Sequence, residues 1–152
     1  MTKLWIFDVD GTLADINHRM HHFDDQKNWA AFFAAQHLDP PYDAVFDVLH
    51  ALFDTGDKCI VITGRDEKHR QVTIDWLQKY CKFDFSNDDL YMRKRGDSKS
   101  DDLVKIEIIN QILKEHPEYK VMGVFEDRHR VIDAWRDAGY YVFECNQTRK
   151  DY

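Results

Sequence analysis

The most informative part of the sequence is Leu4-Trp5-Ile6-Phe7-Asp8-Val9-Asp10-Gly11-Thr12-Leu13. Its first four residues form a short continuous apolar run, which predicts a strand buried inside a sheet. An acidic turn follows at once, and Gly11 can adopt the backbone conformations that a tight turn requires. Asp8 and Asp10 stand two residues apart, so an extended backbone directs both carboxylates into one small region. The stretch therefore predicts a strand that delivers two acidic side chains to one edge of a sheet.

The rest of the chain alternates short apolar runs with longer segments of helical period. Further strands are predicted at residues 59–62, 90–92, 121–125 and 140–143, and helices at residues 45–52, 72–80, 103–113 and 131–138. This rhythm predicts an α/β fold: a three-layer, Rossmann-like parallel sheet with helices on both faces. The 152 residues hold no internal repeat or linker, which predicts one domain over residues 1–152 with a small insert at about 15–41.

Polar side chains follow three of the predicted strands. After Asp8 and Asp10 come Thr63 and Arg65 at the second strand, and then the pair Glu126-Asp127 at the fourth. Ligands of parallel sheets bind at the carboxyl ends of the strands, so we expect these groups to meet. An Asp-x-Asp pair alone also occurs in ordinary turns. Four carboxylates at one edge, however, repel one another unless a cation joins them, and oxygen ligands suit Mg²⁺.

Carboxylates beside a metal ion support one particular chemistry. A carboxylate can attack a phosphoryl group and form an aspartyl phosphate. A second carboxylate can then donate a proton to the leaving alcohol and accept one from the attacking water.

Composition bounds the remaining possibilities. A formal net charge of −7 argues against bulk electrostatic attachment to nucleic acid or to an anionic membrane. Two local clusters of basic residues are present: His18-Arg19-His21-His22 and Arg93-Lys94-Arg95-Lys99. Each is either part of a solvated loop or a set of contacts to phosphates. Three unclustered cysteines, with no signal peptide and no membrane-spanning run, predict reduced thiols in a cytoplasmic protein.

The motifs resemble those of haloacid dehalogenase-like phosphatases. The first motif matches Phe7 to Leu13 and the second matches Val61 to Arg65, while Lys105 and the pair Glu126-Asp127 fit the third and fourth. All four stand in the order of that family. The resemblance implies that Asp8, Asp10, Glu126 and Asp127 hold Mg²⁺.

A narrower resemblance covers Arg95 to Lys105 and Glu126 to Arg136, which are similar to the 3′-phosphatase domain of phage polynucleotide kinase–phosphatases. It implies that Asp8 is the nucleophile, Asp10 the general acid and base, Thr63 a donor to the phosphoryl oxygens and Lys105 the group that neutralises charge. Asp101, one helical turn before Lys105, is expected to orient it. The expected substrate-binding residues are Thr12, Arg19, Gly64, Arg65 and Asp101.

Two features depart from that family. Its fourth motif usually reads Asp-Asp, so the longer Glu126 leaves open whether Glu126 or Asp127 contacts the metal. No Gly-x-x-x-x-Gly-Lys-Ser/Thr loop is present, which predicts a stand-alone phosphatase without kinase activity.

The insert bears on the substrate. Its aromatic residues, Phe23, Trp29, Phe32 and Phe33, are expected to pack as a small helical cap that leaves the site open to a polymer end. The favoured substrate is a 3′-phosphorylated end of DNA or RNA, and the resemblance implies a role in repairing broken ends. Two alternatives stay open: a phosphatase of small esters such as nucleoside monophosphates, and a non-catalytic nucleic-acid binder.

Overall fold

A computed structural model describes residues 1–24 and 27–147 of the chain. Within these residues five strands form one parallel sheet in the order β3-β2-β1-β4-β5. The strands are β1 (Thr2–Phe7), β2 (Lys58–Asp66), β3 (Leu90–Arg93), β4 (Tyr119–Glu126) and β5 (Val142–Glu144). The predicted α/β class and the parallel sheet are confirmed.

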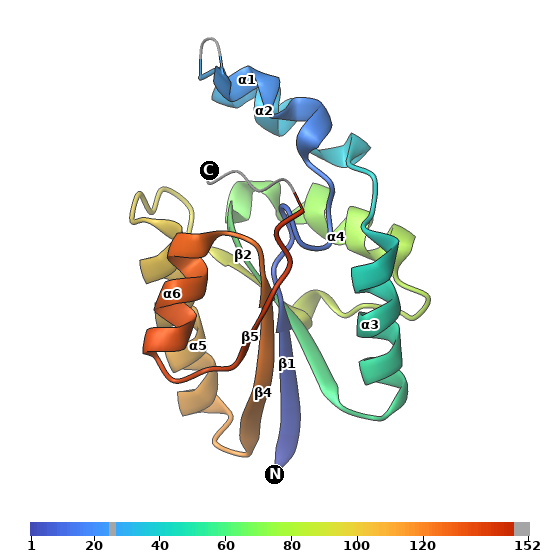
Figure 1. Cartoon of the computed structure of the whole chain (residues 1–152), viewed down its shortest axis with the longest axis vertical. Helices are drawn as coiled ribbons and strands as arrows, with labels where there is room; N and C mark the ends of the chain where they lie inside the picture. Colours follow the sequence, from blue (N-terminus) through green and yellow to red (C-terminus); the bar gives the residue numbers. More distant parts are fainter. Residues whose placement is uncertain (25–26, 148–152) are drawn as a thin grey trace.

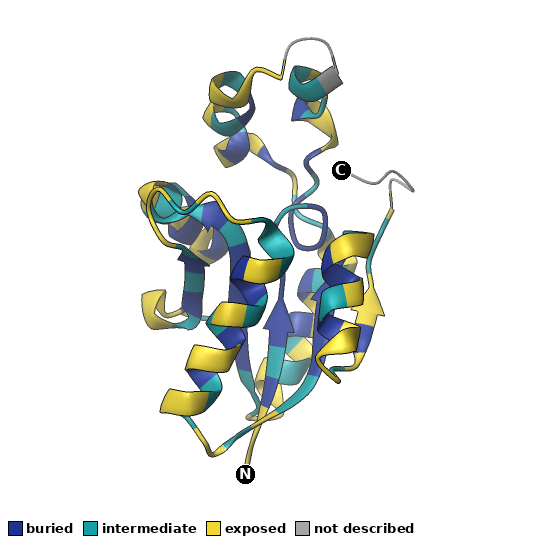
Figure 2. Cartoon of the chain, turned by 90° about the vertical axis from the view of Figure 1, so that its left-hand side faces the viewer, coloured by how far each residue is buried: buried dark blue, intermediate teal, exposed yellow. Residues whose placement is uncertain are grey.

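Helices cover both faces of the sheet and make the three layers (Figure 1). One face carries α3 (Asp43–Asp54) and α4 (Arg70–Tyr80), and the other carries α5 (Asp101–Glu115) and α6 (His129–Asp137). Alternate residues of β2 show why both faces are covered: Cys59 and Val61 join one apolar core, while Ile60 and Ile62 join the other. Figure 2 shows the same division, with buried residues along the strands and exposed ones on the outer sides of the helices.

The insert after β1 forms two short α-helices, α1 (His21–Asp24) and α2 (Trp29–Ala34), flanked by the 3₁₀ helices η1 (Asn17–Arg19) and η2 (Gln36–Leu38). Figures 1 and 2 place α1 and α2 beyond the carboxyl ends of the strands. The aromatic rings pack on one another as predicted, with centroids 4.1 Å apart for Phe23 and Phe32 and 4.7 Å apart for Phe23 and Trp29. The insert is therefore a small cap over the edge where the polar residues meet.

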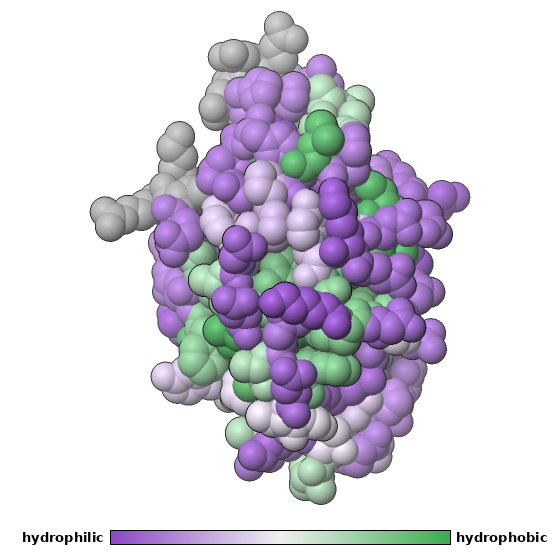
Figure 3. All heavy atoms as spheres, turned by 90° about the vertical axis from the view of Figure 1, so that its right-hand side faces the viewer, coloured by the Kyte–Doolittle hydropathy of each residue, from purple (hydrophilic) through white to green (hydrophobic). Residues whose placement is uncertain are grey.

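Two further 3₁₀ helices are η3 (Glu67–His69), which directly follows β2, and η4 (Asn87–Asp89), which directly precedes β3. Figure 3 shows the α3 side of the molecule, where apolar residues appear between polar ones. On α3, Val48 and Phe53 are both exposed. None of the helices within residues 1–24 and 27–147 has the length and apolar character that crossing a bilayer requires.

Candidate active site

The site lies where the strand order reverses, between β1 and β4. Asp8 directly follows β1, and its N–H donates to the carbonyl oxygen of Phe125 on β4 at 3.0 Å. Glu126 ends β4 and Asp127 follows it. The carboxylates of Asp8, Glu126 and Asp127 are buried, and one oxygen of each lies within 4.8 Å of the others. The predicted convergence of the first and fourth strands is therefore present.

Lys105 reaches this group from one of the helices that cover the sheet. It lies on α5, is buried, and its Nζ donates to Asp8 Oδ1 at 2.7 Å and to Glu126 Oε2 at 2.6 Å. Burial lowers the pKa of Lys105, but Asp8 and Glu126 outweigh burial and raise it above its ordinary value. Lys105 is therefore a permanent cation in contact with Asp8.

The charges of these four groups do not balance. Three carboxylates and one ammonium leave a formal charge of −2 among buried groups. Burial, Glu126 and Asp127 raise the pKa of Asp8 well above its ordinary value. An oxygen-lined site with two excess negative charges fits a divalent cation such as Mg²⁺.

Thr12 closes the group from the turn after β1. Its buried hydroxyl lies 3.2 Å from Asp127 Oδ1 and 3.4 Å from Asp8 Oδ2. The turn places it there because Gly11 adopts a φ of 84°, which disfavours residues with side chains. Thr12 therefore contacts two of the three carboxylates of this group.

The Asp10 carboxylate is bound by two arginines. It accepts hydrogen bonds from Arg65 Nη2 at 2.6 Å, Arg65 Nε at 3.0 Å and Arg19 Nη2 at 2.8 Å. Burial raises the pKa of Asp10, but Arg65 and Arg19 outweigh burial and hold it below its ordinary range. The structure thus pairs the Asp10 side chain with two arginines, whereas the sequence placed it among the metal ligands.

Asp39 completes a second cluster that sequence reasoning missed. Its buried carboxylate accepts from Arg19 Nε and Nη2, both at 2.7 Å, and lies 2.6 Å from His18 Nε2. Arg65 Nη2 lies 3.4 Å from the same carboxylate. Two arginines and two aspartates make this cluster neutral. Arg19, which sequence reasoning weighed as surface charge or a substrate ligand, is fully buried because Asp39 and Asp10 compensate its charge.

Thr63, Gly64 and Arg65 line the neighbouring end of β2. Thr63 is buried and its Oγ1 accepts the backbone N–H of Arg65 at 3.2 Å. Arg65 also donates through Nη1 to Thr73 of α4 at 3.1 Å, a contact with no sequence signal. A Cβ atom on Gly64 would overlap the carboxylate of Asp101. Gly64 therefore lets the start of α5 approach β2.

Asp101 is expected from the sequence to orient Lys105, but its carboxylate does not contact that lysine. Its carboxylate accepts from Arg128 Nη1 at 2.7 Å and from Arg93 Nη2. The Nζ of Lys105 is instead held by Asp8 and Glu126. Asp101 acts on Lys105 through charge alone, since its carboxylate contributes to the raised pKa of that lysine.

This combination of fold and site defines a haloacid dehalogenase-like phosphatase, a hydrolase of phosphoric monoesters. Residues 2–149 match the family model described as the polynucleotide kinase PNKP phosphatase domain. The chain therefore belongs to the family of polynucleotide kinase phosphatase domains.

The chain is also similar to individual proteins whose names refer to polynucleotide kinases. A protein of Autographa californica nuclear polyhedrosis virus, named for polynucleotide kinase and RNA ligase activities, is 28% identical over 136 aligned positions. The match covers 86% of this chain and 17% of that protein. A chain of the Pnkp1/Rnl/Hen1 complex superposes with a TM-score of 0.78 at 29% identity, over 99% of this chain and 47% of that one. This chain thus spans less than half the length of both relatives.

A more distant structure shares the fold alone. The class C acid phosphatase from Bacillus anthracis superposes with a TM-score of 0.69 at 14% identity, covering 99% of this chain and 68% of that one.

Proposed function

We propose that this chain is a magnesium-dependent phosphatase that removes the 3′-phosphate from the end of a DNA or RNA strand through an aspartyl phosphate on Asp8. The observation that carries the proposal is the buried Asp8 at the switch point, held by Lys105 and set beside Asp127 and Glu126. Family membership supports a nucleic-acid end as the substrate. The two Pnkp1/Rnl/Hen1 structures, one titled an RNA repair complex, add to that support.

In the first step an Asp8 oxygen attacks the phosphorus, and the bond between phosphorus and the 3′ oxygen breaks. Lys105 offsets the charge that gathers on Asp8 and the phosphoryl oxygens, and the Thr63 hydroxyl donates to one of those oxygens. Asp10 gives its proton to the departing 3′ oxygen. Arg65 and Arg19 hold the pKa of Asp10 below its ordinary range, so this step requires that the negative charge of the bound substrate phosphate offset their effect and allow Asp10 to be protonated.

In the second step a water molecule attacks the phosphorus, and Asp10 accepts its proton. The bond between Asp8 and phosphorus breaks, which releases inorganic phosphate and restores the carboxylate. Arg19 and Arg65 act here by fixing Asp10, because both guanidinium groups are bound to its carboxylate. They also keep Asp10 ionised, the form that accepts a proton from water.

Asp8 and Asp127 are the residues that would hold Mg²⁺ directly. Glu126 accepts Lys105 Nζ on one oxygen and the backbone N–H of Asp127, at 3.2 Å, on the other, so it positions Lys105 and the turn after β4. Bound Mg²⁺ supplies positive charge that polarises the phosphoryl group. The excess charge of −2 in this cluster is the feature that favours its binding.

Phosphate release tests the proposal. The wild-type protein, Asp8→Asn and the control Asp133→Asn, which removes an exposed acid on α6, are each given a 3′-phosphorylated oligonucleotide and a nucleoside 3′-monophosphate with Mg²⁺ or EDTA. We expect Mg²⁺-dependent release from the oligonucleotide by the wild type and the control, and none by Asp8→Asn. Faster release from the mononucleotide would indicate a small-ester phosphatase. Absence of release by the wild type would contradict the proposal.

A further inference from the structure

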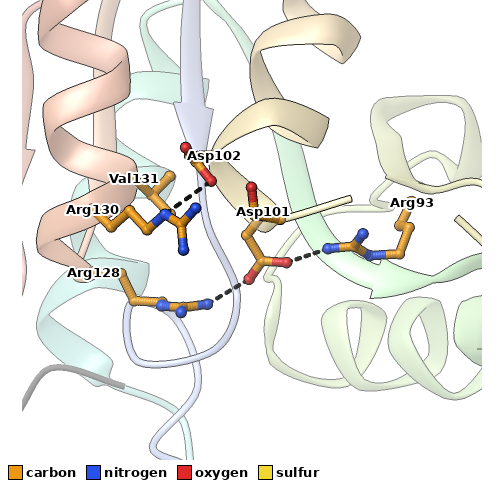
Figure 4. A pocket seen from close by; sticks show the side chains of 7 residues that line it. Arg93, Asp101, Asp102, Arg128, Arg130 and Val131 are labelled. Atoms are coloured by element: carbon orange, nitrogen blue, oxygen red, sulfur yellow. Dashed lines mark hydrogen bonds and ion pairs between the residues drawn. The ribbon is translucent and has the colours of Figure 1, made fainter. Parts of the chain in front are cut away.

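Beside the catalytic carboxylates, the first turns of α5 and α6 enclose a hollow of about 180 Å³ (Figure 4). Its lining residues are Arg93, Ser100, Asp101, Asp102, Arg128, Arg130 and Val131. In Figure 4 the guanidinium groups of Arg93 and Arg128 lie on either side of Asp101, and Arg130 lies against Asp102. None of these seven residues has a step in the mechanism above.

The hollow is locally positive although the chain carries a net charge of −7. Three guanidinium groups face two carboxylates, which leaves a formal charge of +1. Both helices begin here, at the N-cap residues Ser100 and Arg128, and neither of these side chains caps its own helix. The partial positive charge of the two helix N-termini therefore adds to that of the arginines.

Two of the three arginines, Arg93 and Arg128, are held in place by hydrogen bonds within the protein. Arg93 donates to the carbonyl oxygens of Gly64 at 2.8 Å and Asp97 at 3.1 Å, as well as to the Asp101 carboxylate. Arg128 donates to the other oxygen of that carboxylate. Asp101 thus braces an arginine from the end of β3 against one from the start of α6. Side chains that are already ordered lose little conformational entropy when they bind an anion.

Three elements connect the hollow to the reacting group. Arg128 directly follows Asp127, Asp101 precedes Lys105 by one helical turn, and Gly64, which holds Arg93, follows Thr63. An anion in the hollow would therefore neighbour a phosphate bound at Asp8. A nucleic-acid strand carries such an anion next to its 3′-terminal phosphate, namely the first internucleotide phosphate.

We propose that this arginine-lined hollow binds the internucleotide phosphate adjacent to the 3′-terminal phosphate, and so makes a polynucleotide a better substrate than a mononucleotide. The inference rests on the proposed function and adds the group that selects the substrate class. Planar guanidinium groups suit phosphate oxygens because they present paired donors. A nucleoside monophosphate lacks the internucleotide phosphate and gains nothing from the hollow.

Arg130→Ala tests the site with Arg136→Ala as a matched control. Arg130 has a side chain 67% exposed and pairs only loosely with Asp102, at 3.3 Å, so its removal leaves the Asp101 brace in place. Arg136 lies on the same helix with a side chain 50% exposed and pairs with Glu144 at 3.7 Å, outside the hollow. The two variants make the same change of charge on one helix.

The substrates are a 3′-phosphorylated oligonucleotide and the same strand with an uncharged methylphosphonate at the linkage next to its 3′ end. For Arg130→Ala we expect kcat/KM on the ordinary strand to fall about tenfold, mainly through KM, the size of a lost charge-assisted hydrogen bond. On the methylphosphonate strand the same substitution changes kcat/KM less than twofold, because the interaction is already missing. Arg136→Ala behaves as the wild type on both strands. Equal losses on both strands, or no loss beyond that of Arg136→Ala, would overturn the inference.

Binding separates this inference from the proposed function. Fluorescence anisotropy with 3′-hydroxyl forms of both strands needs no turnover. If Arg130→Ala weakens binding only of the ordinary strand while no phosphate is released from any substrate, the phosphate site stands and the proposed function fails. If Asp8-dependent turnover is present and binding by Arg130→Ala equals that by Arg136→Ala, the phosphate site fails and the proposed function stands.

Discussion

At the scale of single residues, the site holds two clusters of buried charge that differ in balance. The Asp8 cluster carries a formal charge of −2, whereas the Asp10 cluster, with Arg19, Asp39 and Arg65, is neutral. The Asp8 cluster has excess negative charge that a cation can neutralise, whereas the charges of the Asp10 cluster already balance. Under the proposed function, the first cluster takes part in chemistry at phosphorus and the second holds Asp10, the residue that transfers protons.

Asp39→Asn tests the second cluster. The substitution leaves the buried Arg19 and Arg65 with one anion fewer, and breaking a buried ion pair from one side costs about 3–5 kcal/mol. We expect the free energy of unfolding from urea denaturation to fall by that amount. Asp137→Asn, at an exposed position of α6, is the control. A loss no larger than that of the control would show that Asp39 does not hold the arginines.

Asp10 predicts a dependence of stability on pH. Because Arg65 and Arg19 hold its pKa below the ordinary value in the folded state, Asp10 stabilises the fold above the unfolded pKa of about 4. This contribution is lost as the pH falls from about 4 toward the lower, folded pKa. We expect the unfolding free energy of Asp10→Asn to depend less steeply on pH between about 4 and 2 than that of the wild type. Parallel curves would contradict the pairing.

The sequence predicted the residues of the first cluster better than those of the second. Asp8, Glu126 and Asp127 directly follow apolar strands, so the sheet alone brings them together. Asp39 instead lies between η2 and α3, next to Pro40, and its arginine partners are 20 and 26 residues away along the chain. Nothing in a local pattern distinguishes such an aspartate from one in an ordinary turn.

At the scale of elements, the close approach of β2 and α5 depends on Gly64. In Gly64→Ala the new methyl group overlaps the Asp101 carboxylate and must displace it, together with its bonds to Arg93 and Arg128. We expect a loss of about 1–3 kcal/mol in unfolding free energy by chemical denaturation.

A double variant tests this cause. Asp101→Ala clears the space, so Gly64→Ala should cost less in that background than in the wild type. Strictly additive losses in unfolding free energy would show that the overlap with Asp101 is not what makes a glycine necessary.

The elements themselves were predictable because their signals are local. Apolar runs gave all five strands and helical periods gave α3 to α6, with boundaries that differ by a few residues. The largest difference lies at the end of β2, which continues to Asp66, whereas the other boundaries, such as those of β5 (Val142–Glu144), differ by at most two residues. Pairing with the neighbouring strand sets the end of β2, and pairing is not visible in one segment alone.

At the scale of the whole molecule, the uncompensated charge predicts that Mg²⁺ stabilises the fold. A ligand that binds only the folded state stabilises it by about 2.7 kcal/mol at 100 times its Kd, which is about 5–10 °C in Tm for a protein of this size. Thermal unfolding with and without Mg²⁺ measures the shift. Asp127→Asn should lose most of it, and the exposed-site control Asp133→Asn should keep it. An equal shift in Asp127→Asn would place the metal elsewhere.

The arrangement of layers explains how one chain holds both the buried carboxylates and the arginine-lined hollow. The carboxylates are buried at the sheet edge, while the described residues of the insert above them form two short α-helices and two 3₁₀ helices. Under the proposed function, we expect a cap of this size to leave room for the end of a polymer.

Trapping the phosphorylated enzyme would show whether Asp8 takes up the phosphoryl group. The protein is mixed with a 3′-phosphorylated oligonucleotide and Mg²⁺, quenched in acid within the first turnover and digested with pepsin at low pH. We predict that mass spectrometry finds one added phosphoryl group on Asp8, absent from Asp8→Asn. A phosphoryl group on another residue, or full turnover by Asp8→Asn, would contradict the account.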